Sequence, residues 1–271
     1  MIKIIIPLSP ILKRHIECFY IYTGETTSTF RYLAFPHYNT GLSFIKGATI
    51  HRKHPQVTIS ENKKNEVKIE LLGKYNCPLL IEYAGKLQEL SIIFKPLGLN
   101  HFFRKNYQTI APQFTQELVH EPWNAFGDTL QFEETYLVVL ESFLLSQFKE
   151  NPELDSLQKA LSMLTDANDE TPIAEIVAQL GYNLKTFQRH FKKHLGTSPV
   201  EYRRICRFRN AIEAKWTDTQ LKTLTDLTYH GGYYDQSYFT KEFRKLTNHN
   251  PKDFFKLTNK IDGDKLVWEI I

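Results

Sequence analysis

Residues 181–199, GYNLKTFQRHFKKHLGTSP, carry cationic and amide side chains at the spacing of an α-helix. Taken at about 100° per residue over 184–195, these side chains fall on one arc: Lys185, Gln188, Arg189, Lys192 and Lys193. Ammonium and guanidinium groups neutralise phosphates, and Gln or Arg side chains form hydrogen bonds with the exposed edges of bases. The spacing therefore predicts a helix face with the chemistry for binding nucleic acid.

The adjoining arc of the same helix is apolar and is expected to anchor it. Leu184, Phe187, Phe191 and Leu195 share this arc. The preceding segment, TPIAEIVAQLG, has its own apolar stripe, and Gly181 can adopt the positive φ that a tight turn between two helices needs. A short helix, a glycine turn and an amphipathic helix form a helix-turn-helix, although helical hairpins without a DNA partner are also common.

The same pattern recurs 52 residues later, and the recurrence favours the DNA-binding interpretation. The positions that match in register are Phe187, Phe191, Pro199 and Tyr202 in the first copy and Phe239, Phe243, Pro251 and Phe254 in the second. Gly232 is the corresponding turn glycine. The polar face of the second helix is expected to carry Ser237, Thr240, Lys241, Arg244 and Lys245.

Positive charge is concentrated in this part of the chain. Residues 181–260 contain 16 Lys and Arg against 7 Asp and Glu, a net +9, whereas the whole 271-residue chain carries only +4. The run between the two copies, SPVEYRRICRFRNAIEAKW, is expected to join them as one long helix. Two helix-turn-helix units on a common helix can place two recognition helices about one DNA turn, roughly 34 Å, apart on one face of a duplex.

The run IAEIVAQLGYNLKTFQRHFKKHLGTSPVEYRRICRFRNAI, followed by GGYYDQSYFTKEFRKLTNHNPKDFF, resembles the DNA-binding domain of AraC/XylS-type bacterial transcriptional regulators over about 155–257. The resemblance implies base-facing side chains in both units, at Lys185, Gln188, Arg189, Gln236, Ser237, Thr240 and Lys241. It also implies double-stranded promoter DNA as the partner, and it leaves room for contact with RNA polymerase.

The first 110 residues have a different pattern. Short runs such as IKIII, CFYIYTG, VKIELLG and LQELSIIFKP alternate with Gly, Pro and Asn, which is typical of a sandwich or a small barrel. Ser9 and Pro10 predict an early helix, and 129–148 predicts a long helix with apolar residues on more than one face. We therefore expect an α+β protein: a β-rich domain (cupin-like barrel or sandwich) with flanking helices, then an all-α domain of two helix-turn-helix units joined by a long helix.

The expected domain boundaries follow from these changes of pattern, with a charged break at KENPELD. The predicted parts are 1–150 for sensing or dimerisation, 151–260 for DNA binding with units at about 171–200 and 221–255, and an apolar tail at 261–271. The long helix before the break has two interpretations, packing within the chain or packing against a second copy in a homodimer. The tail has three interpretations: it docks on the DNA-binding domain, on the first domain or on a partner chain.

The resemblance implies that the first domain binds an effector or mediates dimerisation. Four tyrosines with apolar rings and polar tips are candidates for the wall of an effector pocket: Tyr20, Tyr22, Tyr32 and Tyr38. Plain core packing is the alternative for the same residues. The predicted function is that of a one-component transcriptional regulator that responds to an unknown small molecule, and the alternative is a DNA-binding protein whose first domain only dimerises.

Signals of catalysis are weak in this sequence. His37, His51 and His54 lack the spacing of metal ligands, and no nucleophile, phosphate-binding or dinucleotide motif is present, so we expect no enzyme activity, metal or cofactor. An enzyme domain fused to a helix-turn-helix is the less favoured alternative. The three cysteines form no disulfide or metal pattern. The chain shows no signal peptide and no run of about 18 apolar residues, which predicts a cytoplasmic protein without a membrane partner.

Overall fold

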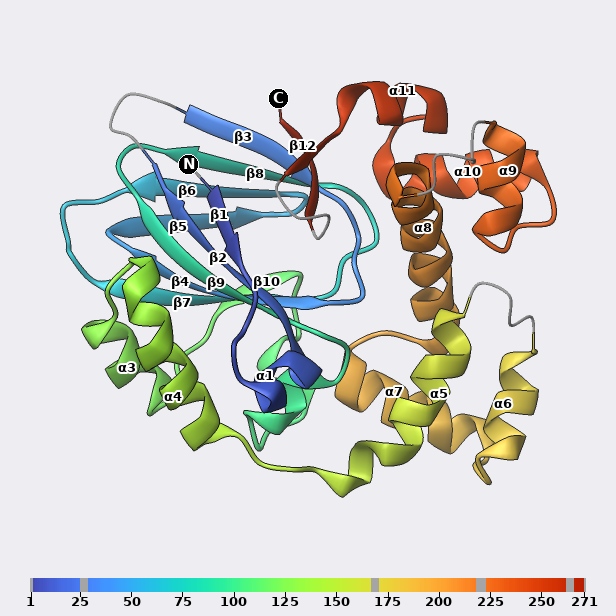
Figure 1. Cartoon of the computed structure of the whole chain (residues 1–271), viewed down its shortest axis with the longest axis horizontal. Coiled ribbons are helices and arrows are strands. Elements are labelled where there is room, and N and C mark those ends of the chain that lie inside the picture. The colour runs from blue at the N-terminus through green and yellow to red at the C-terminus, as the bar shows by residue number, and fades with distance from the viewer. Residues whose placement is uncertain (1, 25–28, 167–170, 218–222, 262–265, 271) are drawn as a thin grey trace.

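Two β-sheets and a separate group of helices make up the computed structural model, as Figure 1 shows. The structure describes residues 2–24, 29–166, 171–217, 223–261 and 266–270. Ten of the twelve strands come from residues 2–117, and the helices from α5 (Asp155–Thr165) onward lie to one side of the sheets. The predicted α+β class is confirmed, with a β-rich region first and a helical region after it.

Each sheet has six strands and each stays open within the described residues, so the β-rich region is a sandwich and not a closed barrel. In spatial order the first sheet contains β1 (Ile2–Ile5), β2 (Ile16–Thr23), β9 (Gln88–Phe94), β4 (Thr40–Lys46), β7 (Val67–Leu72) and β10 (Thr115–Glu117). The second contains β11 (Asn259–Ile261), β12 (Leu266–Ile270), β3 (Thr29–Ala34), β8 (Leu79–Ala84), β6 (Gln56–Glu61) and β5 (Ala48–Lys53).

The first sheet is buried on both faces, which explains the nearly continuous apolar sequence of β2. Successive side chains of a strand point to opposite faces. Phe19 and Ile21 pack in one core with the helices α1 (Pro10–His15), α3 (Trp123–Thr129) and α4 (Leu137–Gln147). Tyr22, on the alternate face, packs in a second core between the two sheets. The molecule therefore has a layer of helices below the first sheet and the second sheet above it.

The helix expected over 129–148 begins later than predicted. Helix α3 ends at Thr129, and α4 starts only at Leu137, after a short 3₁₀ turn at Glu134–Tyr136. Leu130 adopts an extended backbone, and both Leu130 and Phe132 are buried in the core beneath the first sheet. Burying these two side chains turns the chain inward, which breaks the helical run. The early helix was predicted correctly, because Ser9 caps α1 by accepting a hydrogen bond from the Leu12 amide.

The helical region consists of seven helices within the described residues. They are α5 (Asp155–Thr165), α6 (Ile173–Gln179), α7 (Leu184–Leu195), α8 (Pro199–Thr217), α9 (Leu224–His230), α10 (Gln236–Thr247) and α11 (Pro251–Leu257). Helices α6 and α7 form the first helix-turn-helix unit, and α9 and α10 form the second. The turn glycines Gly181 and Gly232 both have φ of 71°, as predicted, and α8 is the long joining helix (Figure 1).

The C-terminal tail returns to the sandwich. Strand β12 pairs antiparallel with β3, with Trp268 opposite Ala34 and Ile270 opposite Tyr32. Figure 1 shows this strand beside β3, next to the end of α11. Of the docking sites that the sequence left open, the structure selects the β-rich region. Residues 262–265 and 271 of the predicted tail lie outside the described residues. The domain boundaries at 150 and 260 stay predictions.

Candidate nucleic-acid interface

Helix α7 has the two-faced form that its sequence predicts. Its first turn is capped by Asn183, whose side chain accepts a hydrogen bond of 3.0 Å from the Lys185 amide. Phe187 and Phe191 are fully buried. Leu184, expected on the same buried arc, is 41% exposed instead. Helical side chains lean toward the N-terminal end of their helix, and at the first position this carries Leu184 past the edge of the core.

The predicted polar face of α7 is largely exposed. Lys185, Gln188, Arg189 and Lys192 are exposed, and they share one face of the helix. Lys193 differs, because it is half-buried and borders a cavity of about 270 Å³ together with residues of the β-rich half such as Asn100 and Arg104. The structure therefore brings four of the five predicted side chains of α7 to one surface and places Lys193 at its margin.

Helix α10 repeats this arrangement. The side chain of Asp235 caps its first turn by accepting hydrogen bonds of 3.0 Å from the amides of Ser237 and Tyr238. Phe239 and Phe243 are buried. Of the predicted polar positions, the structure leaves five exposed and one half-buried: Gln236, Ser237, Lys241, Arg244 and Lys245 are exposed, and Thr240 is half-buried.

Lys245 has a structural partner that the sequence did not reveal. Its ammonium group lies 2.6 Å from the carboxylate of Glu242, which is 3% exposed and also pairs with Arg204 of α8. Burial alone would raise the pKa of Glu242, but the hydrogen bond from Lys245 and the charge of Arg204 outweigh it and hold the pKa below its usual value. The carboxylate thereby fixes α10 against the long helix.

We expect the Glu242→Gln substitution to lower the free energy of unfolding by about 1–3 kcal/mol at neutral pH, because two charge-assisted hydrogen bonds are weakened. A carboxyl group with a lowered folded-state pKa stabilises the protein above its unfolded-state pKa, and this contribution is lost as pH falls through the folded-state pKa. The difference between variant and wild type should therefore shrink below about pH 4.5. Urea unfolding across a pH series measures this difference in the free energy of unfolding, and the exposed Glu175→Gln serves as the control. If the difference stays constant with pH, the Glu242 carboxylate does not have the lowered pKa that its ion pairs imply.

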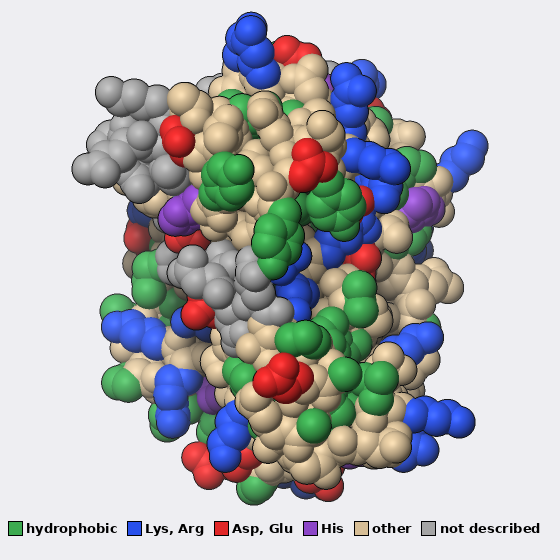
Figure 2. All heavy atoms as spheres, turned by 90° about the vertical axis from the view of Figure 1, so that its right-hand side faces the viewer, with side chains coloured by type: hydrophobic (Ala, Val, Ile, Leu, Met, Phe, Trp, Pro, Cys, Tyr) green, Lys and Arg blue, Asp and Glu red, His purple; other side chains and the backbone are tan. Residues whose placement is uncertain are grey.

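Figure 2 looks onto the side of the molecule formed by the two units, and Lys and Arg side chains gather over much of the right half of this face. Hydrophobic side chains lie beside them. In the second unit three tyrosines are more than half exposed, namely Tyr229, Tyr234 and Tyr238. Sequence reasoning did not include them in the interface. For Tyr238 the available signal was its position on α10 off the buried arc that Phe239 and Phe243 define. Tyr229 is on α9 and Tyr234 lies in the turn before α10, so that arc gave no signal for them.

The β-rich half supplies one buried apolar residue to the core of each unit. Leu97, 3% exposed, packs with the residues of α5 to α8 that form the core of the first unit. Phe35, 1% exposed, packs with Phe208, Phe239 and Phe254 in the core of the second. The rings of Phe35 and Phe254 are 4.9 Å apart between centroids. Both helix-turn-helix units are therefore held against the sandwich.

A buried arginine strengthens the second of these contacts. The guanidinium group of Arg209, on α8, donates hydrogen bonds to the carbonyl oxygens of Pro36 (2.8 Å) and Phe35 (2.6 Å). Burial lowers the pKa of Arg209 to about 10, although the neighbouring Tyr75 and Tyr38 act in the opposite direction. The joining helix is thereby tied to the segment that carries Phe35.

The four predicted effector tyrosines do not meet at one place. Tyr20, Tyr22 and Tyr32 lie inside the sandwich near Glu89, which is 2% exposed. The Tyr20 hydroxyl donates a 2.8 Å hydrogen bond to Oε1 of Glu89. Burial and the nearby Glu89 carboxylate both raise the pKa of Tyr20 and Tyr32. Tyr38 lies elsewhere, with its ring 6.2 Å from that of Tyr202 on α8.

The histidines weighed as metal ligands are dispersed. No group of three or more His, Cys, Asp or Glu side chains in the described residues is arranged to hold a metal ion. The Nδ1 atom of His37 accepts a hydrogen bond from the Asn39 amide, which gives it a local structural role. None of the described helices is both long enough and apolar enough to cross a membrane.

Comparison with known proteins adds two family matches. A family described as a helix-turn-helix domain matches residues 176–257, and a domain of unknown function (DUF6597) matches residues 5–116. The HTH-type transcriptional activator RhaS of Escherichia coli O157:H7 (strain EC4115 / EHEC) is 26% identical over 158 residues, which cover 57% of this chain and 55% of RhaS. The chain thus spans about half the length of the curated relatives it matches.

Among solved structures, ToxT from Vibrio cholerae aligns with 88% of this chain and 97% of its own at 14% identity, with a TM-score of 0.47. A DNA-binding transcriptional dual regulator from Escherichia coli K-12 aligns with 36% of this chain and 96% of its own, at 16% identity and a TM-score of 0.31.

Proposed function

We propose that this chain, which belongs to the AraC/XylS-type transcriptional regulators by its helix-turn-helix region, binds promoter DNA in a sequence-specific manner through α7 and α10. The observation that carries the proposal is the repeated construction of these two helices. Each is capped at its N-terminus, buries a pair of phenylalanines and exposes a polar, cationic face. The first turns of such helices are the part that enters the major groove.

The proposed roles of the side chains follow from their chemistry. Gln188 and Arg189 in the first unit have the donor and acceptor groups to bind base edges, as do Gln236 and Ser237 in the second. The polar face of α7 that carries Gln188 and Arg189 also includes Lys185. The polar face of α10 that carries Gln236 and Ser237 also includes Thr240 and Lys241. Side chains farther along the helices are better placed for phosphates, which position the protein without reading the sequence: Lys192, Lys193, Arg244 and Lys245.

The β-rich half is proposed to regulate this activity, in response to a small molecule or by dimerisation. Helix α4 supports the second possibility, because Val138, Val139 and Leu145 are exposed on it in the described structure. An apolar surface of this kind is a candidate contact with a second copy. RNA polymerase as a further partner, and a cytoplasmic location, stay predictions.

The proposal is tested by selecting preferred DNA sites from a random duplex pool with the full chain and then comparing two variants. Arg189→Ala is expected to weaken binding to the selected site by about 1–3 kcal/mol and to relax the preference at one base pair. Lys192→Ala is expected to weaken binding to all sequences and to reduce the salt dependence by about one phosphate contact.

Lys53→Ala is the matched control, because Lys53 is an exposed cation on β5 of the second sheet. It should leave the affinity for the selected site and the salt dependence of binding unchanged. If Arg189→Ala binds the selected site as tightly as the control and with the same preference, α7 is not the reading helix. Failure of the wild type to select any site would contradict sequence-specific binding as a whole.

A further inference from the structure

A cavity of about 270 Å³ separates the last turn of α7 from the loop that leads into α2 (Tyr107–Ile110). Helix α7 contributes Lys193 to its lining, and the β-rich half contributes Arg104 and Lys105. Arg104 and Lys105 are exposed, and Lys193 is half-buried. Cations from two distant parts of the chain therefore line one cavity.

The positive charge around this cavity is not neutralised by the protein. None of the ion pairs of the described residues involves Arg104, Lys105 or Lys193. Glu153, exposed in the segment before α5, is the only acidic side chain among the described residues that line the cavity. Burial and the positive charge of Lys193 lower the pKa of His194, so this lining residue is neutral at neutral pH. Three cations and one carboxylate leave an excess of positive charge.

The two sides of the cavity are held together by close contacts. The side-chain nitrogen Nδ2 of Asn100 lies 3.4 Å from Nδ1 of His194 on α7, and both residues are buried. Gly196 ends α7 with a φ of 71°, and a Cβ at this position would lie 2.5 Å from the ring of Tyr107 on α2. Asn100 and Tyr107 flank the cationic loop in the sequence, so these contacts fix the place of that loop beside α7.

The cavity adjoins the polar face of α7. Arg189 and Lys192 are exposed on this face. At about 100° per residue, Lys193 lies about 40° around the helix from Arg189, so it connects the polar face with Arg104 and Lys105. The major groove of DNA is about 12 Å wide, and phosphates flank a helix that lies in it on both sides. A duplex bound to the polar face of α7 therefore brings phosphates to the side of the helix where the cavity lies.

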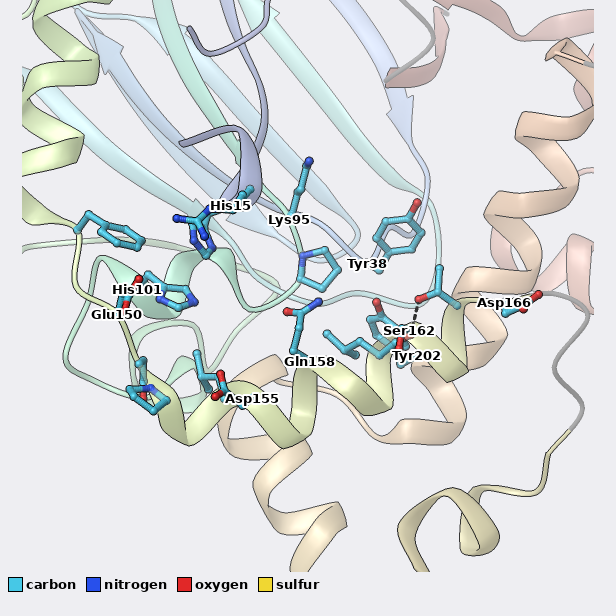
Figure 3. Close-up of a pocket in the computed structure, with 18 residues that line it drawn as sticks. His15, Tyr38, Lys95, His101, Glu150, Asp155, Gln158, Ser162, Asp166 and Tyr202 are labelled. Atoms are coloured by element: carbon cyan, nitrogen blue, oxygen red, sulfur yellow. Dashed lines mark hydrogen bonds between the residues drawn. The ribbon is translucent and has the colours of Figure 1, made fainter. Parts of the chain in front are cut away.

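The surface that attracts phosphate ends at the segment before α5. On the other side of this segment a larger cavity, of about 820 Å³, lies between α1 and α5, and Asn151 lines both cavities. Figure 3 shows Glu150 and Asp155 among the residues that line the larger cavity. These carboxylates repel a phosphate. The excess of positive charge at this junction is therefore on the side of α7.

We propose that Arg104 and Lys105 bind phosphates of the DNA duplex that flank the groove occupied by α7. The β-rich half then contributes directly to the affinity for DNA, and its docking on α7 is part of the DNA-binding surface. Contacts with phosphates position a protein on the duplex without reading its bases. The inference rests on the proposed function, because it requires the duplex to lie on the polar face of α7.

The test measures binding of the full chain to the selected site and to a random-sequence duplex between about 50 and 200 mM salt. Each lost phosphate contact should reduce the slope of log K against log salt by about 0.9, so Arg104→Gln/Lys105→Gln should reduce it by about 1.8. The loss of affinity at the lowest salt should then exceed the loss at the highest salt by about tenfold. The base preference at the selected site should not change, because phosphate contacts carry no sequence information.

Lys63→Gln/Lys64→Gln is the matched control, because it removes two exposed cations that are likewise adjacent in a loop of the β-rich half. This loop leads into the start of β7, which lies level with the start of β9 across β4, whereas Arg104 comes after the end of β9. The control pair is therefore at the opposite end of the first sheet and should leave the slope unchanged. Arg104→Lys/Lys105→Arg, which keeps both charges, should retain the slope of the wild type.

Equal slopes for Arg104→Gln/Lys105→Gln and the control pair would overturn the proposal. The same conclusion follows if inorganic phosphate binds the wild type in titration calorimetry and loses affinity in Arg104→Gln/Lys105→Gln while the slope for DNA is unchanged, because the cations then serve a free anion. Melting temperatures without DNA show whether a loss of affinity reflects unfolding.

The two kinds of duplex separate this proposal from the proposed function. If the wild type binds both duplexes equally tightly and Arg104→Gln/Lys105→Gln still lowers the slope, sequence-specific binding fails and the phosphate contacts stand. If Arg189→Ala relaxes the base preference and Arg104→Gln/Lys105→Gln behaves like the control pair, the proposed function stands and the phosphate contacts fail. Absence of binding to either duplex by the wild type overturns both.

Discussion

The Phe35→Ala substitution is expected to lower the free energy of unfolding by about 3–5 kcal/mol, the usual cost of removing a fully buried phenylalanine. Residue 35 follows strand β3, but its side chain lies in the core of the second helix-turn-helix unit, beside Phe208 and Phe254. The loss should therefore appear in α9, α10 and α11 before it appears in the sandwich. Urea unfolding measures the total loss in free energy of unfolding, and amide hydrogen exchange shows which elements lose protection.

Phe30→Ala is the matched control, because Phe30 is on β3 itself and packs against Tyr22, Tyr32 and Tyr83 inside the sandwich. Its substitution should destabilise the sandwich and leave the protection of α10 in place. Faster exchange in α10 is expected only for Phe35→Ala. If the two variants give the same pattern of exchange, the second unit does not depend on the β-rich half for its core.

The second large loss of stability is expected from the Glu89→Leu substitution. Glu89 accepts hydrogen bonds from Tyr20 (2.8 Å), Ser91 (2.7 Å) and Tyr83 (2.5 Å) in the interior of the sandwich. Each buried donor that loses its acceptor costs about 1–3 kcal/mol, so removing the carboxylate should lower the free energy of unfolding by several times the cost of an average surface substitution. Urea unfolding measures the difference.

Glu82→Leu is the control, because Glu82 forms an exposed ion pair with Arg31 on neighbouring strands and should change stability by no more than about 1 kcal/mol. The loss in free energy of unfolding for Glu89→Gln should lie between those for Glu89→Leu and Glu82→Leu, since the amide oxygen of Gln still accepts hydrogen bonds. If Glu89→Leu is as stable as the wild type, the carboxylate is not a structural acceptor. Tyr20 and Tyr32 would then again be candidates for contact with an effector.

The recognition helices were predictable because their information is local. Side chains three and four residues apart share a helix face, so the positions of Phe187 and Phe191 identify the buried arc without any knowledge of the rest of the fold. The prediction of α7 over 184–195 agrees with the structure at both ends. Leu184 was wrongly placed on the buried arc, because the periodicity does not include the lean of helical side chains at the first turn.

The roles of Phe35, Leu97 and Arg209 were not predictable in the same way. Their partners lie far away along the chain, as for Arg209 and Phe35, which are 174 residues apart. Strand periodicity assigns a side chain to a face of its sheet but does not tell which other element covers that face. The same reasoning explains why the long helix over 129–148 was predicted in one piece and is broken by the burial of Leu130 and Phe132.

The sequence by itself determined the class of the protein, the two helix-turn-helix units and the polar faces of α7 and α10, since each depends on spacing within one short segment. Only the tertiary structure decided that the β-rich half completes the cores of both units and that the backbone of the C-terminal tail pairs with β3. These features arise where segments distant in the chain come together, and no single segment carries the signal for them.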